Sequence, residues 1–245
     1  MKQFKTAQEQ AVGPRIAQTF ERSSDTIEDR LATFPRYARR QQLKRFLAMY
    51  EIFKLILPVK GSIVECGVFR GFGFMSWFKL SSILEPENLT RQIYGFDTFE
   101  GFPSVADQDD YPDSQTIVGG LAANSEAELL ELIDIADQDR FLGHIPKAHL
   151  IKGDIAKTAP QFITDNPHVL VSLLFLDADL FEPTQAALEA FLPRMPKGAI
   201  LAFDELDNPQ WPGETLALLE TMGVGNLELK RLEWDPYISF ARIGV

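Results

Sequence analysis

The sequence predicts a doubly wound α/β fold, in which a mostly parallel, seven-stranded open sheet carries helices on both faces. Short apolar runs alternate with amphipathic segments through residues 58–245, a pattern that is typical of successive βαβ units. Residues 169–176 form an almost continuous apolar run, as expected for a central strand that is buried on both faces. The last two expected strands, residues 227–233 and 237–243, are joined by a short connection, so they must pair antiparallel.

The first 57 residues are expected to form an N-terminal helical extension to this sheet domain. Residues 1–35 are polar and irregular in pattern, so we expect a flexible arm with some helix. In residues 37–57, apolar side chains recur at three- and four-residue steps, which predicts an amphipathic helix. A basic cluster near its start is either a solvated face or a clamp for the phosphate of a nucleotide-sugar. The cluster consists of Arg36, Arg39, Arg40, Lys44 and Arg45.

The remaining elements follow in order along residues 58–245, which we expect to form the main domain. Apolar runs predict parallel strands at residues 62–66, 92–96, 149–152, 169–176 and 199–203. Amphipathic segments predict helices at residues 72–84, 126–135, 159–164, 183–192 and 213–222. Residues 104–124 are acidic and rich in turn formers. An excursion of this length is often an active-site lid, and an ordinary surface loop is the alternative.

Composition excludes several classes of function. The formal net charge is −11, from 35 acidic and 24 basic residues, which disfavours nucleic acid or an anionic membrane as the main partner. Cys66 is the only cysteine, so no intramolecular disulfide forms and a cytoplasmic protein is expected. No run of about 18 apolar residues predicts a membrane-spanning helix, and residues 1–5 are not followed by an apolar signal-peptide core.

The most informative motif is a strand that runs into a glycine-rich turn at residues 63–73. Glu65 stands two residues before Gly67, and Gly71 opens the next helix. Glycines at such a turn let a ligand approach the backbone closely. The carboxylate of Glu65 would repel a pyrophosphate, but it would accept the ammonium group of an amino acid. The motif therefore favours S-adenosylmethionine over a dinucleotide.

Acidic residues also stand at other strand ends. Asp97, Asp177 and Asp204 follow expected strands directly, and Asp154 lies just past another. The carboxyl ends of parallel strands meet in one crevice, where open α/β sheets bind ligands. Because like charges repel there, either a cation or hydrogen-bonded ligand groups must compensate them.

These acids divide into two groups. Asp97 ends the second strand, where a carboxylate accepts the two hydroxyls of a ribose. Asp154 either receives the exocyclic amine of adenine or caps the next helix. The expected cofactor-binding residues are Glu65, Gly67, Gly71, Phe72, Asp97, Thr98, Phe99 and Asp154.

The second group lies at the next two strand ends. Asp177, Asp204 and Glu205 are hard oxygen ligands that fit Mg²⁺. The alternative for Asp204 and Glu205 is a turn or a helix start. Asp179 is a ligand, a general base or a helix cap.

These segments resemble the macrocin/mycinamicin type of S-adenosylmethionine-dependent sugar O-methyltransferases. The resemblance spans roughly residues 26–222, and it implies a class I, Rossmann-like methyltransferase fold, S-adenosylmethionine as methyl donor and a divalent metal, usually Mg²⁺. It places Asp177, Asp204 and Glu205 at metal-ligand positions, although a second aspartate is more usual than Glu205. It also implies that the N-terminal extension builds oligomer contacts and part of the acceptor pocket. The segments that carry it are residues 61–73, 95–103, 176–184, 197–198 and 203–205.

The sequence therefore predicts metal-dependent methylation of a sugar hydroxyl on a nucleotide-sugar, a glycan or a glycosylated natural product. A chelated metal would lower the pKa of the attacking hydroxyl, and a base would remove its proton. Asp179 is the first candidate for that base and Asp177 the second catalytic residue, whereas His144 and His149 are weaker candidates. We expect a homo-oligomer with a small-molecule sugar acceptor.

Three other functions compete with this hypothesis. A nicotinamide dehydrogenase is disfavoured by Glu65 and by the glycine spacing. A metal-dependent nucleotide-sugar glycosyltransferase would leave the glycine-rich turn unexplained. A non-catalytic S-adenosylmethionine-binding protein has no need of three metal-binding acids.

Overall fold

The computed structural model describes residues 6–110 and 116–244. The chain forms two compact units, residues 1–47 and residues 48–245. The division falls inside helix α3 (Arg40–Ile56), ten residues before the boundary that the sequence suggests. The second half of α3 belongs with the sheet domain because its apolar side chains, Met49, Ile52 and Phe53 among them, are fully buried.

The first unit contains more helix than its polar sequence indicates. Its elements are α1 (Ala7–Arg22), α2 (Ile27–Ala32) and the short η1 (Phe34–Arg36). Helix α1 begins at a capping box, in which Thr6 Oγ1 accepts from the Glu9 amide at 3.3 Å and Glu9 Oε2 accepts from the Thr6 amide at 2.7 Å. None of the described residues of α1 and α2 is buried. The sequence nevertheless contains two signals for α1, the capping box and the recurrence of Val12, Ile16 and Phe20 at four-residue steps.

The second unit is the predicted doubly wound domain. Its sheet has the strand order β3-β2-β1-β4-β5-β7-β6, and β1 to β5 run parallel while β7 pairs antiparallel with β5 and with β6. This confirms the predicted fold class, including the antiparallel C-terminal hairpin. The strands are β1 (Ser62–Cys66), β2 (Ile93–Asp97), β3 (Ala148–Lys152), β4 (Val171–Leu176), β5 (Ile200–Phe203), β6 (Lys230–Leu232) and β7 (Asp235–Arg242).

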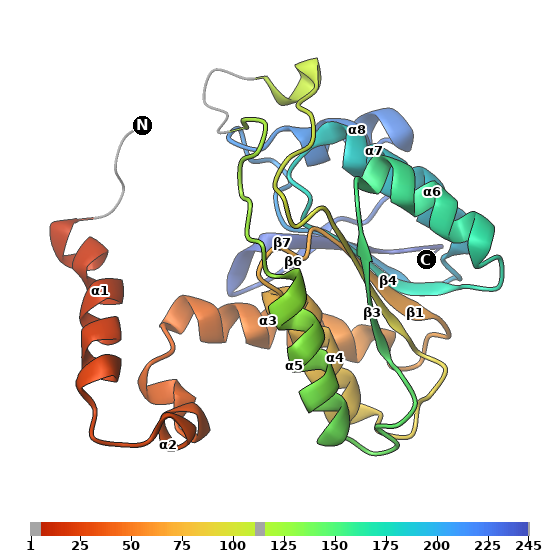
Figure 1. Ribbon diagram of the computed structural model, residues 1–245. Helices are drawn as coiled ribbons and strands as arrows, with labels where there is room; N and C mark the ends of the chain where they lie inside the picture. The colour runs from red at the N-terminus through yellow and green to blue at the C-terminus, as the bar shows by residue number, and fades with distance from the viewer. Residues whose placement is uncertain (1–5, 111–115, 245) are drawn as a thin grey trace. The chain divides into compact units, whose positions relative to one another are not determined.

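Helices cover both faces of this sheet. Figure 1 shows α6, α7 and α8 stacked on one face, with α4 and α5 on the other. No helix among the residues that the structure describes is long and apolar enough to cross a membrane. The helices are α4 (Phe72–Leu84), α5 (Glu126–Gln138), α6 (Ile155–Asp165), α7 (Phe181–Phe191) and α8 (Gly213–Thr221), with short 3₁₀ turns η2 (Asp107–Asp109) and η3 (Leu192–Arg194).

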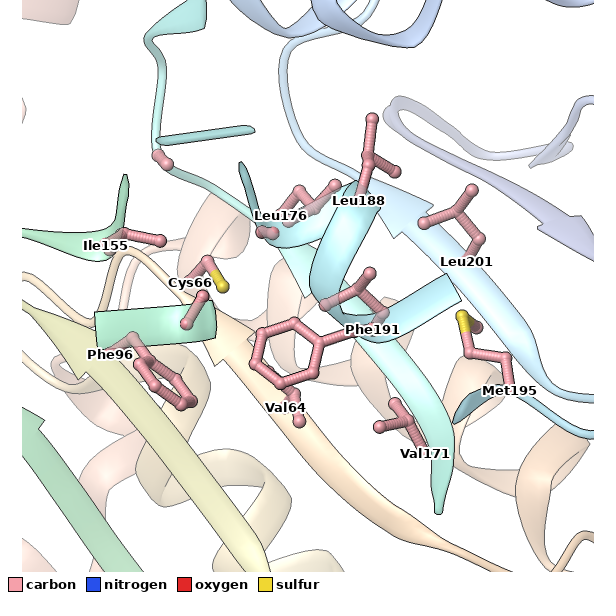
Figure 2. Packing of buried hydrophobic residues seen from close by; sticks show 14 of the residues in the cluster. Val64, Cys66, Phe96, Ile155, Val171, Leu176, Leu188, Phe191, Met195 and Leu201 are labelled. Atoms are coloured by element: carbon pink, nitrogen blue, oxygen red, sulfur yellow. The ribbon is translucent and has the colours of Figure 1, made fainter. Parts of the chain in front are cut away.

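The core lies between the central strands and the layer of α6 and α7. All six residues of β4 are buried, as predicted for a strand covered on both faces. Figure 2 shows Phe191 and Leu188 of α7 beside Val64 and Leu176. The rings of Phe191 and Phe96 lie 5.5 Å apart. Each such side chain contributes about 1.5–3 kcal/mol by leaving water, which fixes α7 and therefore the loop that precedes it.

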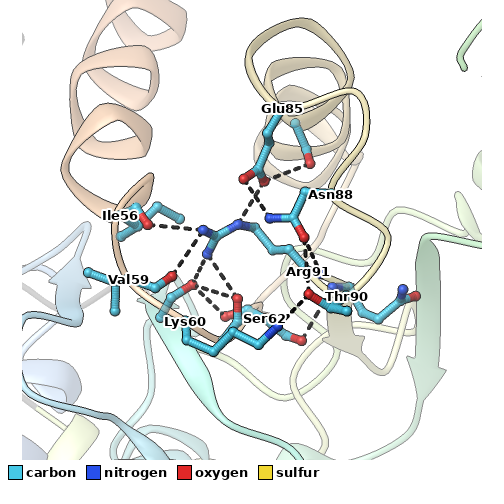
Figure 3. A network of polar contacts seen from close by, with 12 residues as sticks. Ile56, Val59, Lys60, Ser62, Glu85, Asn88, Thr90 and Arg91 are labelled. Carbon is cyan, nitrogen blue, oxygen red and sulfur yellow. Dashed lines mark hydrogen bonds and ion pairs between the residues drawn. The ribbon is translucent and has the colours of Figure 1, made fainter.

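A buried arginine joins the amino-terminal ends of the strands, opposite the edge that carries the acids. Arg91 is 2% exposed, and its guanidinium donates to the carbonyl oxygens of Ile56 (3.0 Å), Val59 (3.0 Å) and Gly61 (2.9 Å). Its Nε lies 2.7 Å from Glu85 Oε1 in an ion pair (Figure 3). One side chain thus ties the end of α3, the start of β1 and the end of α4 to β2.

Candidate functional site

A cleft opens at the carboxyl ends of the central strands, where the connections from β1 and β4 leave in opposite directions. This is the position at which open α/β sheets bind ligands. The cleft holds about 510 Å³ of empty space, a volume that includes its open mouth. It brings together six of the residues predicted from the sequence: Gly67, Asp97, Thr98, Asp154, Asp177 and Asp179.

Other predicted residues stand behind the cleft or beside it. The described lining does not include Glu65, Gly71, Phe72, Phe99, Asp204 or Glu205. Residues of the 104–124 insertion and of the loop before it, which the sequence did not single out as ligand contacts, do line it. They are Gly101, Phe102, Pro103, Gly120 and Leu121.

The first glycine of the motif is required by a close approach of two loops. Gly67 has a φ of +95°, and a Cβ atom on it would lie 1.9 Å from the carbonyl oxygen of Asp177. The loop after β1 therefore crosses directly against the loop after β4. Any side chain at this position would push the two halves of the cleft apart.

Glu65 is almost completely buried in β1. Its side chain faces the start of α4, where a Cβ atom on Gly73 would lie 2.5 Å from Glu65 Oε1. Binding of a ligand ammonium group by Glu65 stays a prediction.

Cys66, the next residue of β1, is buried as well. Burial raises the pKa of its thiol, and the charges of Glu65 and Glu214 add to the effect. Cys66 is therefore a buried apolar residue and not a nucleophile.

Asp97 clamps two loops at the end of β2. Its Oδ2 accepts from the amide of Phe69 at 2.7 Å, and its Oδ1 accepts from the amide of Phe99 at 2.6 Å. Phe69 and Phe99 both have positive φ, +52° and +58°, a conformation that is strained for a residue with a side chain. A carboxylate has about four lone-pair positions, so Asp97 retains acceptor capacity for ligand hydroxyls in the cleft.

The insertion is anchored to the helix that follows the second acidic loop. Asp109 is 1% exposed, and its Oδ1 accepts from the amide of Phe181 at 2.8 Å while its Oδ2 accepts from the amide of Ala106 at 3.1 Å. Burial raises the pKa of this carboxyl. Residues 111–115 of the predicted lid lie outside the described residues, and its closure stays a prediction.

Asp154 performs the capping role that the sequence left open. Its Oδ1 accepts from the amide of Ala156 at 3.1 Å, and Lys157 lies 2.9 Å away in an ion pair. This cap explains why α6 begins at Ile155, four residues earlier than the apolar pattern indicates. Because Asp154 also lines the cleft, the adenine contact stays a prediction.

Asp177 and Asp204 stand side by side on adjacent strands. Leu176 of β4 pairs with Phe203 of β5, and Asp177 and Asp204 are the residues that come directly after them. The Asp204 amide donates to the carbonyl oxygen of Leu176 at 3.0 Å. Asp179 has a φ of +63° and is 9% exposed. The strand register therefore brings the two predicted acids together without any help from a ligand.

The third predicted metal ligand, Glu205, makes a local hydrogen bond. Glu205 Oε2 accepts from the side-chain amide of Asn208. Within residues 6–110 and 116–244, no group of three or more histidine, cysteine, aspartate or glutamate side chains is arranged to hold a metal ion. Asp177 and Asp204 are donors of the right type for Mg²⁺, but the arrangement does not fit a preformed three-ligand site. The divalent metal is therefore not supported by the geometry.

The two histidines considered as bases lie away from the cleft. His149 is in β3, where its Nε2 lies 2.9 Å from Gln92 Oε1 and its ring stacks on Tyr94 at 5.4 Å. Burial lowers its pKa. In the described part of the chain, neither His144 nor His149 lines the cleft, so neither is placed to take a proton there.

Sequence reasoning missed Glu214, a completely buried carboxylate at the start of α8. It accepts from the amides of Asp179 at 3.2 Å and Glu205 at 3.1 Å. Burial raises its pKa well above the ordinary value, and Asp179 adds to the effect. In the sequence it is one more acid in the first turn of a helix, which gives no sign of burial.

Comparison with known proteins connects this cleft to one family. The family model described as Macrocin-O-methyltransferase (TylF) matches residues 37–215. A curated relative, the 8-demethyl-8-(2,3-dimethoxy-alpha-L-rhamnosyl)-tetracenomycin-C 4'-O-methyltransferase of Streptomyces olivaceus, is 30% identical over 156 residues. That match covers 60% of this chain and 53% of the relative, so the matched segment spans about half of the relative's length.

Solved structures match over nearly the whole chain. A structure of CalS11, a calicheamicin methyltransferase, superposes with a TM-score of 0.94 at 35% identity and covers 98% of this chain and 95% of its own. An apo structure of CalS11, described as a TDP-rhamnose 3'-O-methyltransferase, gives 0.86 at 33% identity over 98% and 97%. The O-methyltransferase NovP, at 0.60 and 19% identity over 81% and 79%, shares the fold alone.

Proposed function

The chain belongs to the Macrocin-O-methyltransferase (TylF) family, and from that premise we propose that it transfers a methyl group from S-adenosylmethionine to a sugar hydroxyl. The observation that carries the proposal is the cleft that Asp97 and Asp177 both line, beside the close approach of Gly67 to the Asp177 backbone. One carboxylate suits a ribose, and the other stands where an acceptor sugar would meet the methyl donor.

The relatives indicate the class of acceptor. One is named for methylation of a rhamnosyl group on a natural product, and another for methylation of TDP-rhamnose. A nucleotide-linked deoxysugar is therefore the acceptor class that we propose for this chain. Phe102 and Trp211, whose rings meet edge to face at 6.0 Å, offer apolar faces on which a sugar ring would pack.

The residues that line the cleft suit S-adenosylmethionine in their chemistry. The cofactor supplies an electrophilic methyl group on its sulfonium. We assign its ribose hydroxyls to the carboxylate of Asp97, and its adenosine to the wall that contains Asp154 and Ile155.

The chain's own contribution to the reaction is to orient the acceptor and to take a proton. A sugar hydroxyl is a weak nucleophile, so a base within hydrogen-bond reach is needed as the methyl group moves. We propose Asp179 for this role because it lines the cleft beside Asp177. Holding donor and acceptor in line supplies much of the remaining acceleration.

A Mg²⁺ requirement is a separate proposal with its own test. Asp177 and Asp204 would be the residues that hold the ion, and it would supply a Lewis acid for vicinal hydroxyls of the acceptor. Protein that has been treated with a chelator and dialysed should lose methyl transfer and recover it with Mg²⁺. A full rate after chelation would reject the metal and leave the methyltransferase proposal intact.

The main test combines cofactor binding with product detection. The full chain should bind S-adenosylmethionine by calorimetry and should convert TDP-rhamnose into a product that is one methyl group heavier by mass spectrometry. Asp97→Asn should weaken cofactor binding about 10- to 100-fold, because a hydrogen bond to a charged group is lost. Asp139→Ala, which removes an exposed carboxylate in the turn that follows α5, is the matched control. Cofactor binding that Asp97→Asn leaves unchanged would refute the site.

A further inference from the structure

Glu214 is a buried acid with no role in the cleft itself. It is the second residue of α8 and is 0% exposed. Its Oε1 accepts from the amide of Asp179, and its Oε2 accepts from the amide of Glu205. Each carboxylate oxygen therefore holds a different loop: one follows β4 and the other follows β5.

Burial of an acid at this position carries a cost in stability. A carboxylate that is removed from water loses its hydration, and the charges of Asp179 and Asp204 raise the cost further. An apolar residue on α8 would avoid that cost but would take away the acceptors that Glu214 gives to the Asp179 and Glu205 amides. A carboxylate provides two acceptor oxygens at a fixed spacing, so each of the two loop amides, those of Asp179 and Glu205, has its own acceptor.

The surrounding packing makes this contact rigid. A Cβ atom on Gly213 would lie 2.3 Å from Asp109 Oδ1 and 2.4 Å from the Phe181 amide nitrogen. The start of α8 is thus in direct contact with the backbone that follows the Asp177–Asp179 loop. Asp179 itself has a strained φ of +63°, a conformation that persists only where surrounding contacts hold it.

We propose that Glu214 is the positioning residue that sets the distance and orientation between the Asp177–Asp179 loop and the Asp204–Glu205 loop. It acts through the two loop amides and does not touch the ligands. The inference rests on the proposed function, because those loops carry the base and the acceptor-binding acids. Residues that support ligands from behind in this way typically change affinity or activity about 10- to 100-fold when they are replaced.

Glu214→Gln in the full chain is the decisive variant. Glutamine keeps the shape but offers one acceptor and one NH₂ group, so one of the two loop amides loses its partner. We expect kcat for TDP-rhamnose to fall about 10- to 100-fold, while binding of S-adenosylmethionine is unchanged. The matched control is Leu218→Ala on the same helix. It removes an apolar side chain that is 1% exposed and lowers the melting temperature, but it takes no acceptor away from the Asp179 or Glu205 amide.

Amide hydrogen exchange, followed by NMR, provides a readout that does not depend on activity. The Asp179 and Glu205 amides should exchange slowly in the wild type and in Leu218→Ala, and at least one should exchange faster in Glu214→Gln. If Glu214→Gln does not fold, Glu214→Asp withdraws both oxygens by one methylene and the same amides are measured.

Two results would overturn the proposal. One is equal activity of Glu214→Gln and Leu218→Ala at equal loss of melting temperature. The other is unchanged exchange of both amides in Glu214→Gln. Failure of the proposed function looks different: the wild type would neither bind S-adenosylmethionine nor methylate a sugar, while the two amides would still report whether Glu214 holds the loops.

Discussion

Replacement of the buried arginine at the amino-terminal edge should destabilise the sheet domain without changing its chemistry. Arg91→Met removes the donor of three backbone carbonyl oxygens and leaves the carboxylate of Glu85 without its cation. The side chain of Glu85 is only 10% exposed, so water cannot fully replace the lost partner. The hydrophobic stem of methionine fills much of the space, which isolates the loss of polar contacts.

The size of the effect follows from these contacts. Removing one partner of a buried ion pair costs about 3–5 kcal/mol. Domains are stable by about 5–15 kcal/mol, so the loss is a large share of the total. At about 2–4 °C for each kcal/mol in a domain of this size, the melting temperature should fall by roughly 6–20 °C.

The assay is urea unfolding of the wild type, Arg91→Met and the double variant Arg91→Met/Glu85→Leu. The double variant should recover part of the stability, because it no longer contains an unpaired buried charge. Methyl transfer at low temperature should be unchanged, since Arg91 lies at the edge of the sheet opposite the cleft. A loss below about 1 kcal/mol in the single variant would refute the argument, because that is the size of an exposed ion pair.

Three further predictions concern other buried or cleft groups. Burial lowers the pKa of Lys147 to about 8 from 10.5. Between those pH values the unfolded chain keeps a proton that the folded protein has released, so the free energy of unfolding should rise with pH, and Lys147→Met should flatten that rise in urea titrations. Asp109→Ala should cost about 1–3 kcal/mol, and exchange of the Phe181 amide should become faster; unchanged exchange would contradict the anchoring of the insertion. Asp177→Ala should abolish methyl transfer while calorimetry still detects S-adenosylmethionine, and a combined loss of both would mean that Asp177 holds the cofactor.

Local pattern was sufficient for most of the architecture. The bounds of β1 and α4 agree with the apolar pattern, and the other strands differ by a few residues at their ends. The polar composition of residues 1–35 obscured α1, although Val12, Ile16 and Phe20 recur there at four-residue steps. The apolar pattern placed the start of α6 too late, because the cap at Asp154 and not an apolar residue begins that helix.

The candidate site was predicted less completely than the fold. Asp97, Asp177 and Asp179 line one cleft, because β2 and β4 run parallel on either side of β1 and their carboxyl ends lie at the same edge of the sheet. The outer parts were not predicted, because they depend on where long connections return. For example, the Phe181 amide donates a hydrogen bond to Asp109, which lies 72 residues away in the sequence.

Local periodicity and chain order were sufficient to predict which strands run parallel and which acids stand at their carboxyl ends. The three-dimensional arrangement was needed to see that Gly67 serves a crossing of two loops, that Glu65 is buried against α4, and that Glu214 joins the loops after β4 and β5. Burial of a carboxylate depends on what packs over it. That partner is contributed by segments distant in the chain, which no local pattern encodes.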